Sequence, residues 1–141
     1  MTEVRESCEF GVPAPHVWSL VADFAGFAEM LVASRNGNVQ ISGAGVGMTR
    51  AVRVDGQFLL ERLEEMDEDN FQTRYSMLVT GPFPISDYQA TIALTAVSAD
   101  RCALQWTGCF VPLDGAEREA ADAIRAVYVE GIALMQRRFG A

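Results

Sequence analysis

The segment Asp114–Phe139, DGAEREAADAIRAVYVEGIALMQRRF, is the longest helical pattern in the chain and carries most of the fold prediction. Its apolar residues recur at three- and four-residue steps, the spacing of one face of an α-helix. These residues are Ile124, Val127, Tyr128, Gly131, Ile132, Met135 and Phe139. Asp114 and Glu117 match a capping-box variant with the aspartate as N-cap. The pattern predicts an amphipathic helix of about 24 residues, roughly 36 Å long at 1.5 Å per residue.

Alternating apolar and polar residues before this helix predict a series of strands. The predicted strands are Glu3–Val12, Val39–Ser42, Met48–Val54, Gln57–Met66 and Phe71–Val79, followed by two apolar rows over Tyr88–Leu94 and Cys102–Phe110. The Asp55-Gly56 pair is typical of a two-residue hairpin turn. Because strands that follow one another through hairpins are antiparallel, the pattern predicts one antiparallel sheet.

Two short helices are predicted between the first strand and the second. Pro15 suits the first turn of a helix, and apolar residues then follow at helical spacing up to Phe24. Gly26 is expected to separate this helix from a second one, Phe27–Val32. The sequence therefore predicts a single α+β domain over residues 1–141. In it a curved antiparallel sheet of six to seven strands wraps around the long C-terminal helix, because one helix cannot cover so many strands of a flat sheet. A curled sheet leaves space for a cavity beside the helix.

Composition excludes several classes of partner. The 141 residues include 11 basic and 19 acidic side chains, a net charge of -8 that repels nucleic acid and anionic membranes. No apolar run approaches the roughly 20 residues of a membrane span, so no integral membrane association is expected. The N-terminal MTEVRESCEF is polar, unlike a signal peptide, and Cys8, Cys102 and Cys109 form no CxxC pair. We therefore expect reduced thiols and a cytoplasmic location. With His16 as the single histidine, neither a metal nor a cofactor is expected.

Five stretches together carry a family resemblance. They are VPAPHVWSLVADF, GVGMTRAVRVDG, LLERLEEMDEDNFQTRYSM, FPISDYQATIAL and ALQWTGCFVPLDG. In this order and over nearly the whole chain, they resemble the START/Bet v 1-like superfamily, specifically its polyketide cyclase/dehydrase and lipid-transport group. The resemblance implies a helix-grip fold whose members bind or transform apolar and amphipathic small molecules. The plant abscisic-acid receptors, a remote branch, use a lysine for their ligand, and this chain contains no lysine.

The hairpin at Asp55-Gly56 pairs two charged residues. A two-residue turn sets Val54 opposite Gln57, Val52 opposite Leu59 and Arg50 opposite Glu61, all on one face of the sheet. The family resemblance implies that Glu61 is a pocket residue, which favours this face as the inner one. Arg50 and Glu61 would then form a polar anchor in an apolar pocket. The alternative is a surface ion pair worth under about 1 kcal/mol.

The remaining candidate residues lie on predicted inward rows. The resemblance implies pocket positions at Glu61, Tyr75 and Tyr88, and at Ile124, Tyr128 and Ile132 of the long helix. The complete set of expected ligand-binding residues is Met30, Arg50, Val52, Val54, Leu59, Glu61, Tyr75, Met77, Tyr88, Ala90, Trp106, Ile124, Tyr128 and Ile132. Ordinary core packing is the alternative for the aromatic residues, and gap filling is the alternative for the methionines.

Three functions are compatible with the sequence. The first is a carrier or sensor of a small hydrophobic molecule. The second is a cyclase, dehydratase or isomerase that uses Arg50, Glu61 and a tyrosine. The third is a protein-interaction domain with a vestigial cavity. No nucleophile–base–orienter arrangement can be recognised, which favours the first function and leaves catalytic residues unassigned. The expected partner is a small hydrophobic molecule, and a homodimer is left open.

Overall fold

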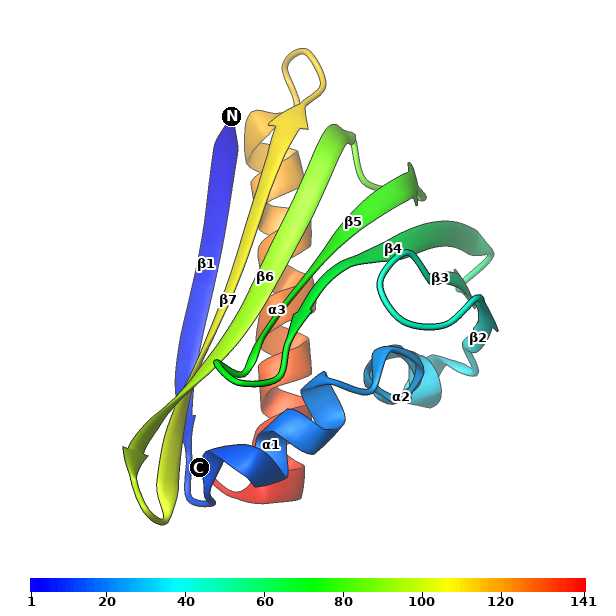
Figure 1. Ribbon diagram of the computed structural model, residues 1–141. Helices are drawn as coiled ribbons and strands as arrows, with labels where there is room; N and C mark the ends of the chain where they lie inside the picture. The colour runs from blue at the N-terminus through cyan, green and yellow to red at the C-terminus, as the bar shows by residue number, and fades with distance from the viewer.

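The computed structural model describes residues 1–141 and shows an open seven-stranded sheet curved around one long helix (Figure 1). The elements are β1 (Thr2–Phe10), α1 (Ala14–Val21), α2 (Phe24–Val32), the 3-10 helix η1 (Ala33–Arg35), β2 (Asn38–Ser42), β3 (Thr49–Val54), β4 (Gln57–Asp67), β5 (Gln72–Thr80), β6 (Ile85–Ser98), β7 (Arg101–Pro112) and α3 (Glu117–Phe139). All strand pairs are antiparallel, in the order β1-β7-β6-β5-β4-β3-β2. The predicted α+β helix-grip fold is confirmed.

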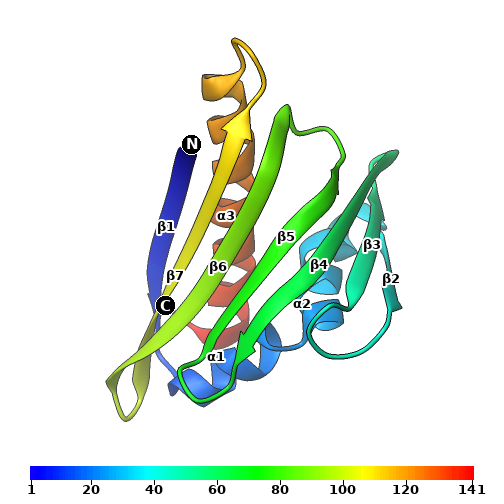
Figure 2. The ribbon, with the colours of Figure 1, turned by 45° about the horizontal axis from the view of Figure 1, so that its top comes forward.

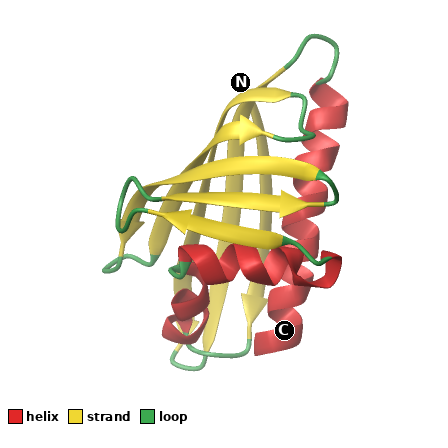
Figure 3. Cartoon of the chain, turned by 90° about the vertical axis from the view of Figure 1, so that its right-hand side faces the viewer, coloured by secondary structure: helices red, strands yellow, loops and turns green.

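The helices lie on the concave side of the sheet. Figure 2 shows β1, β7 and β6 running alongside α3, while β4, β3 and β2 curl away from that helix. The short helices lie across the other part of the concave side, where α2 contacts β2, β3 and α3 (Figure 3). The gap that one helix leaves under a wide sheet is thus covered by α1 and α2. No single helix has the length and apolar composition of a membrane span, although α1 with α2–η1 passes that test as a pair bent by 84°.

The inward rows of β6 and β7 form much of the core. Tyr88, Ala90, Ile92 and Leu94 of β6 are all buried, as the alternation predicts. The same holds for Cys102, Leu104, Trp106 and Phe110 of β7. Four of the residues in the α3 apolar row (Ile124, Tyr128, Ile132 and Met135) pack against them. Each fully buried large apolar side chain contributes about 1.5–3 kcal/mol, so these rows hold α3 to the sheet.

The N-terminus of α3 differs from the prediction. The helix begins at Glu117 with Ala116 as its N-cap, and no side chain caps it. Gly115 adopts a positive φ of 75°, and the Ala116 N–H donates to the Leu113 carbonyl. This tight turn places Asp114 too early in the chain to reach the first helical N–H groups. The predicted capping box at Asp114 is therefore wrong.

The break between α1 and α2 also differs from the prediction. It lies at Ala22 and Asp23, whereas Gly26 lies inside α2. Asp23 is the N-cap of α2, and its Oδ1 accepts a hydrogen bond of 2.9 Å from the Gly26 N–H. A Cβ at position 26 would collide with the Asp23 carboxylate. Gly26 thus leaves room for the cap of α2 and does not interrupt a helix.

Strand β5 contains a β-bulge that the alternation does not reveal. Met77 pairs with Glu61, but Val79 pairs with Leu60, so Leu78 is an extra residue without a partner. After such a bulge the alternation of side chains between the two faces changes phase. Val79 is consequently 40% exposed, and the predicted inward row Phe71–Val79 ends at Met77.

Candidate functional site

The β3–β4 hairpin has the predicted register. Asp55 and Gly56 both have positive φ, 52° and 75°, as a type I′ turn requires. Val54 pairs with Gln57, Val52 with Leu59 and Arg50 with Glu61. A two-residue turn fixes the pairing of all later residues, which is why the sequence alone could set Arg50 opposite Glu61.

Arg50 and Glu61 form a buried ion pair. The Arg50 side chain is 3% exposed and that of Glu61 is 10% exposed, so the surface alternative is wrong. Arg50 Nε donates to Glu61 Oε1 at 2.8 Å, and Arg50 Nη1 donates to the Phe24 carbonyl at 2.7 Å. The guanidinium carbon lies 4.0 Å from the centre of the Phe24 ring and 4.9 Å from that of Tyr75. Hydrogen bonds and aromatic faces together compensate the burial of this charge.

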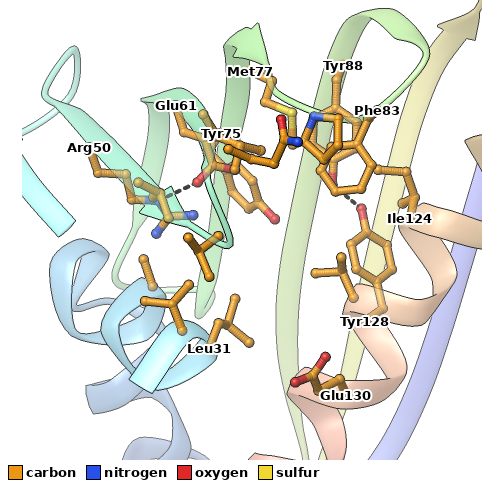
Figure 4. A pocket seen from close by; sticks show the side chains of 18 of the residues that line it. Leu31, Arg50, Glu61, Tyr75, Met77, Phe83, Tyr88, Ile124, Tyr128 and Glu130 are labelled. Carbon is orange, nitrogen blue, oxygen red and sulfur yellow. Dashed lines mark hydrogen bonds and ion pairs between the residues drawn. The ribbon is translucent and has the colours of Figure 1, made fainter. Parts of the chain in front are cut away.

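A cavity of about 370 Å³ lies beside this pair (Figure 4). It separates the main core from a smaller apolar cluster of Ala28, Val32 and Val52 between α2 and β3. Of its 21 lining residues, 14 are hydrophobic. Eleven of the predicted site residues line it, namely Arg50, Val52, Val54, Leu59, Glu61, Tyr75, Met77, Tyr88, Trp106, Ile124 and Tyr128. The inner faces of β3–β7 and α3 thus meet in one apolar space with a charged pair in its wall.

Three predicted site residues do not line this cavity. Ala90 and Ile132 have inward positions, but they are buried in the main core. Met30 packs against the same core from α2. The cavity extends over only part of the interior, and tight packing fills the remainder. Their role in ligand binding therefore stays a prediction, without support from the lining of this cavity.

The structure adds residues that sequence reasoning missed. They are Ala28, Leu31, Val32, Arg35, Asp55, Gln57, Pro82, Phe83, Val127 and Glu130. Two had a usable signal, because Gln57 shares the inner face of the hairpin and Val127 belongs to the apolar row of α3. The others come from α2, η1, the β3–β4 turn, the β5–β6 loop and a charged position of α3, and no local pattern specifies how these parts meet.

Three tyrosines and a tryptophan form the wall nearest α3. The Tyr88 and Tyr128 hydroxyls are hydrogen-bonded to each other, and Trp106 Nε1 donates to the Tyr75 hydroxyl at 3.2 Å. The Trp106 ring stacks on Tyr128 with 4.2 Å between centroids. Gly108 lies beneath the Tyr128 hydroxyl, which leaves no space for a Cβ there. Burial raises the pKa of Tyr75, Tyr88 and Tyr128, so all three phenols stay protonated at neutral pH.

Arg35 links three elements at the rim of the cavity. Its Nη2 donates to Glu130 Oε2 of α3 at 2.9 Å, and its Nε lies 3.8 Å from Asp55 Oδ2 in the β3–β4 turn. All three residues line the cavity, and their side chains are 48%, 38% and 60% exposed for Arg35, Glu130 and Asp55. No group of three or more histidine, cysteine or acidic side chains is arranged to hold a metal ion.

Family comparison agrees with this architecture. The family model described as polyketide cyclase/dehydrase and lipid transport matches residues 1–140. The chain belongs to this family. The resemblance inferred from the sequence is thereby confirmed, and the fold is one that builds cavities for hydrophobic ligands. None of the curated proteins matches the chain significantly in sequence.

Solved structures show the same polyketide cyclase/dehydrase fold. A protein from Thermobifida fusca is 28% identical with a TM-score of 0.85, covering 99% of this chain and 94% of its own. The Zhui aromatase/cyclase from Streptomyces sp. R1128 is 21% identical with a TM-score of 0.74, covering 96% of this chain and 89% of its own. Norcoclaurine synthase from Thalictrum flavum is 15% identical with a TM-score of 0.75, covering 97% and 96%. The last two likenesses extend to the fold alone.

Replacing Arg35 with alanine tests how much the rim ion pairs contribute. We expect the Arg35→Ala variant of this family member to lose under about 1 kcal/mol of unfolding free energy, because exposed pairs are screened by water and salt. Urea denaturation in low and in high salt measures the effect, which should shrink as salt rises. A loss that is large and independent of salt would show that Arg35 holds α2 and α3 together through packing.

Proposed function

We propose that this protein binds a small hydrophobic or amphipathic molecule in the cavity beside Arg50 and Glu61, as a carrier or sensor. The observation that supports the proposal best is the cavity itself, about 370 Å³ with mostly apolar walls and one buried charged pair. Small-molecule sites typically measure about 300–1,000 Å³ and combine apolar walls with a few polar groups that orient the ligand.

The polar groups of the cavity support recognition more than proton abstraction. Burial keeps the phenols of Tyr75, Tyr88 and Tyr128 protonated, so they are suited to hydrogen bonding with a ligand. Glu61 is already held by Arg50. No buried serine or cysteine lines the cavity as a nucleophile beside a base. These features favour binding of an unchanged molecule.

Binding of the neutral fluorophore N-phenyl-1-naphthylamine tests the proposal. We expect saturable binding at one site, and we expect Leu59→Asn to weaken it about tenfold, since a lost apolar contact of about 1.4 kcal/mol changes affinity by that factor. Leu60→Asn is the matched control, because Leu60 is the next residue on the same strand and lies on the opposite face. Fluorescence titration gives both affinities, and circular dichroism checks that both variants are folded. Equal affinities, or no saturable binding, would contradict the proposal.

A cyclase- or dehydratase-type reaction is the second candidate function. The observation in its favour is a buried arginine–glutamate pair facing an apolar cavity, where charge acts strongly on a bound molecule. Two structural neighbours are named as an aromatase/cyclase and a norcoclaurine synthase, which makes a reaction worth testing. Native mass spectrometry of freshly purified protein identifies any retained molecule. If that molecule returns unchanged after incubation, the carrier or sensor function is supported. If it is converted, and conversion stops in Arg50→Met/Glu61→Leu while the fluorophore still binds, the enzyme is supported.

A further inference from the structure

The sheet is divided between β5 and β6. The two strands pair only over Gln72–Ser76 with Gln89–Ala93. Beyond this ladder, the residues Met77–Thr80 and Ile85–Tyr88 have no backbone pairing with each other. Figure 2 shows β5 and β6 diverging from this point toward the loop that connects them. The centre of the sheet therefore contains a split, bounded by two strands and their connecting loop.

Three features around this split interrupt strand pairing: two irregularities in the neighbouring ladders and a loop with two prolines. The extra residue Leu78 interrupts the β4–β5 pairing, and a second irregularity interrupts β6–β7 between Ser86 and Gln89. Asp87, inside that second irregularity, has a positive φ of 53°. Bulges bend a strand and raise its local twist. The connecting loop also contains Pro82 and Pro84, which have no N–H to contribute to a ladder.

Two hollows meet at the split. On the inner side, Met77, Pro82, Phe83 and Tyr88 all line the cavity. On the outer side, a groove of about 390 Å³ lies against the same strands. Its lining residues are Met1, Arg62, Glu64, Ser76, Met77, Leu78, Asp87, Tyr88, Gln89 and Cys109. Met77 and Tyr88 line both hollows, so these two residues border the cavity on one side and the groove on the other.

The two shared residues differ in how they are held. Tyr88 is 2% exposed and its hydroxyl is hydrogen-bonded to Tyr128 of α3. Met77 has no such polar anchor, and an unbranched methionine changes rotamer readily. Met77 is therefore the residue that could open and close the split while Tyr88 stays in place.

We propose that the split is an opening of the cavity, and that a chain-like amphiphile passes through it with its apolar part inside and its polar end in the outer groove. This inference rests on the proposed ligand-binding function and names its ligand class. The groove is lined by the carboxylates of Glu64 and Asp87, by the guanidinium of Arg62 and by Met1, which carries the α-amino group. Arg62 is moreover engaged by Glu64 at 2.9 Å. This balance of two negative and two positive groups favours an uncharged polar end over a charged one.

A tethered apolar group tests whether the groove communicates with the cavity. In a Cys8→Ser/Cys109→Ser background only the buried Cys102 remains. Gln89→Cys would be labelled with a naphthyl maleimide on a short flexible arm, and free N-phenyl-1-naphthylamine would be titrated. Tethering gives millimolar effective concentration, so we expect the label to weaken binding of the free probe by about tenfold or more. The matched control is Gln105→Cys, an exposed position on the same outer face, where β7 pairs fully on both sides.

The outcomes separate this inference from the function on which it rests. Weakened binding after labelling at position 89, with unchanged binding after labelling at 105, would support the opening. Equal binding in both labelled proteins would overturn it, while binding by the unlabelled protein would still support the cavity function. Absence of probe binding by the unlabelled protein would contradict the proposed function itself.

Exchange kinetics provide a second measurement. We expect Met77→Ala to raise both the association and the dissociation rates of N-phenyl-1-naphthylamine several-fold in stopped-flow experiments. Val97→Ala, an apolar truncation at a 54% exposed position of β6 that lines neither hollow, should leave both rates unchanged. A change in the dissociation rate alone would mean that Met77 only contacts the ligand, and it would count against an opening at this position.

Discussion

Replacing Arg50 with methionine should lower the free energy of unfolding by about 3–5 kcal/mol, because it leaves the buried Glu61 carboxylate without its partner. Arg50 Nε donates to Glu61 Oε1 at 2.8 Å in a site where both side chains are at most 10% exposed. Methionine keeps much of the volume that packs on the Phe24 and Tyr75 rings, so lost packing contributes little. Urea denaturation followed by circular dichroism measures the change.

Two further variants isolate the pair as the cause. Arg50→Met/Glu61→Leu removes both charges and should recover most of the lost stability, since neither group is then left unpaired. Arg53→Met is the matched control, because Arg53 lies on the same strand with its side chain exposed on the other face. It should cost under about 1 kcal/mol. If Arg50→Met and Arg53→Met were equally stable, burial of the Arg50–Glu61 pair would be contradicted.

Trp106→Ala should also destabilise the protein by about 3–5 kcal/mol, the usual cost of removing a large buried aromatic side chain. Trp106 is fully buried, stacks on Tyr128 and meets the edge of Phe27 at 5.4 Å between centroids. Its loss would also leave the Tyr75 hydroxyl without its hydrogen-bond donor. Trp106→Phe keeps a ring in place and should cost less than half as much. Denaturant unfolding followed by far-ultraviolet circular dichroism compares the variants without relying on tryptophan fluorescence.

Trp18 provides the control that separates stability from ligand binding. It is 5% exposed and hydrogen-bonds Glu68 at 2.7 Å, but it does not line the cavity. We therefore expect Trp18→Ala to be destabilising while it leaves the affinity for N-phenyl-1-naphthylamine unchanged. Trp106→Ala, in contrast, should change that affinity in the fraction that remains folded. An unchanged affinity in Trp106→Ala would remove Trp106 from the proposed ligand-binding wall.

The local sequence pattern was sufficient to predict which strand residues face inward and to predict the register of the β3–β4 hairpin. The alternation over β6 and β7 identified the buried rows, and the Asp55-Gly56 turn fixed the pairing of Arg50 with Glu61. Both signals act over a few residues, where the pleat and the turn geometry leave a single arrangement. Which face of that hairpin points inward was inferred from the family resemblance, because both of its faces carry apolar and charged residues.

The extent of the cavity could not be predicted in the same way. Ala90 and Tyr88 share one row of β6, yet only Tyr88 borders the cavity. Periodicity gives the face on which a residue lies, whereas the position of a cavity depends on how far α2 and α3 stand from the sheet. Local periodicity also could not predict which residues meet at the rim of the cavity. Arg35, Asp55 and Glu130 come from three distant parts of the chain, and only the folded structure brings them together.

Under the proposed opening, the bulge at Leu78 makes the length of β5 relevant to ligand access. That single unpaired residue bends β5 where the sheet divides, and the ladder with β6 stops just before it. Deleting one residue from the segment Met77–Val79 would straighten the strand and favour continued pairing toward the loop. If the split is an opening, a single-residue insertion or deletion in β5 would change access for long ligands to this cavity. Such changes leave every side chain of the cavity wall intact, so alignments that compare only substituted positions would overlook them.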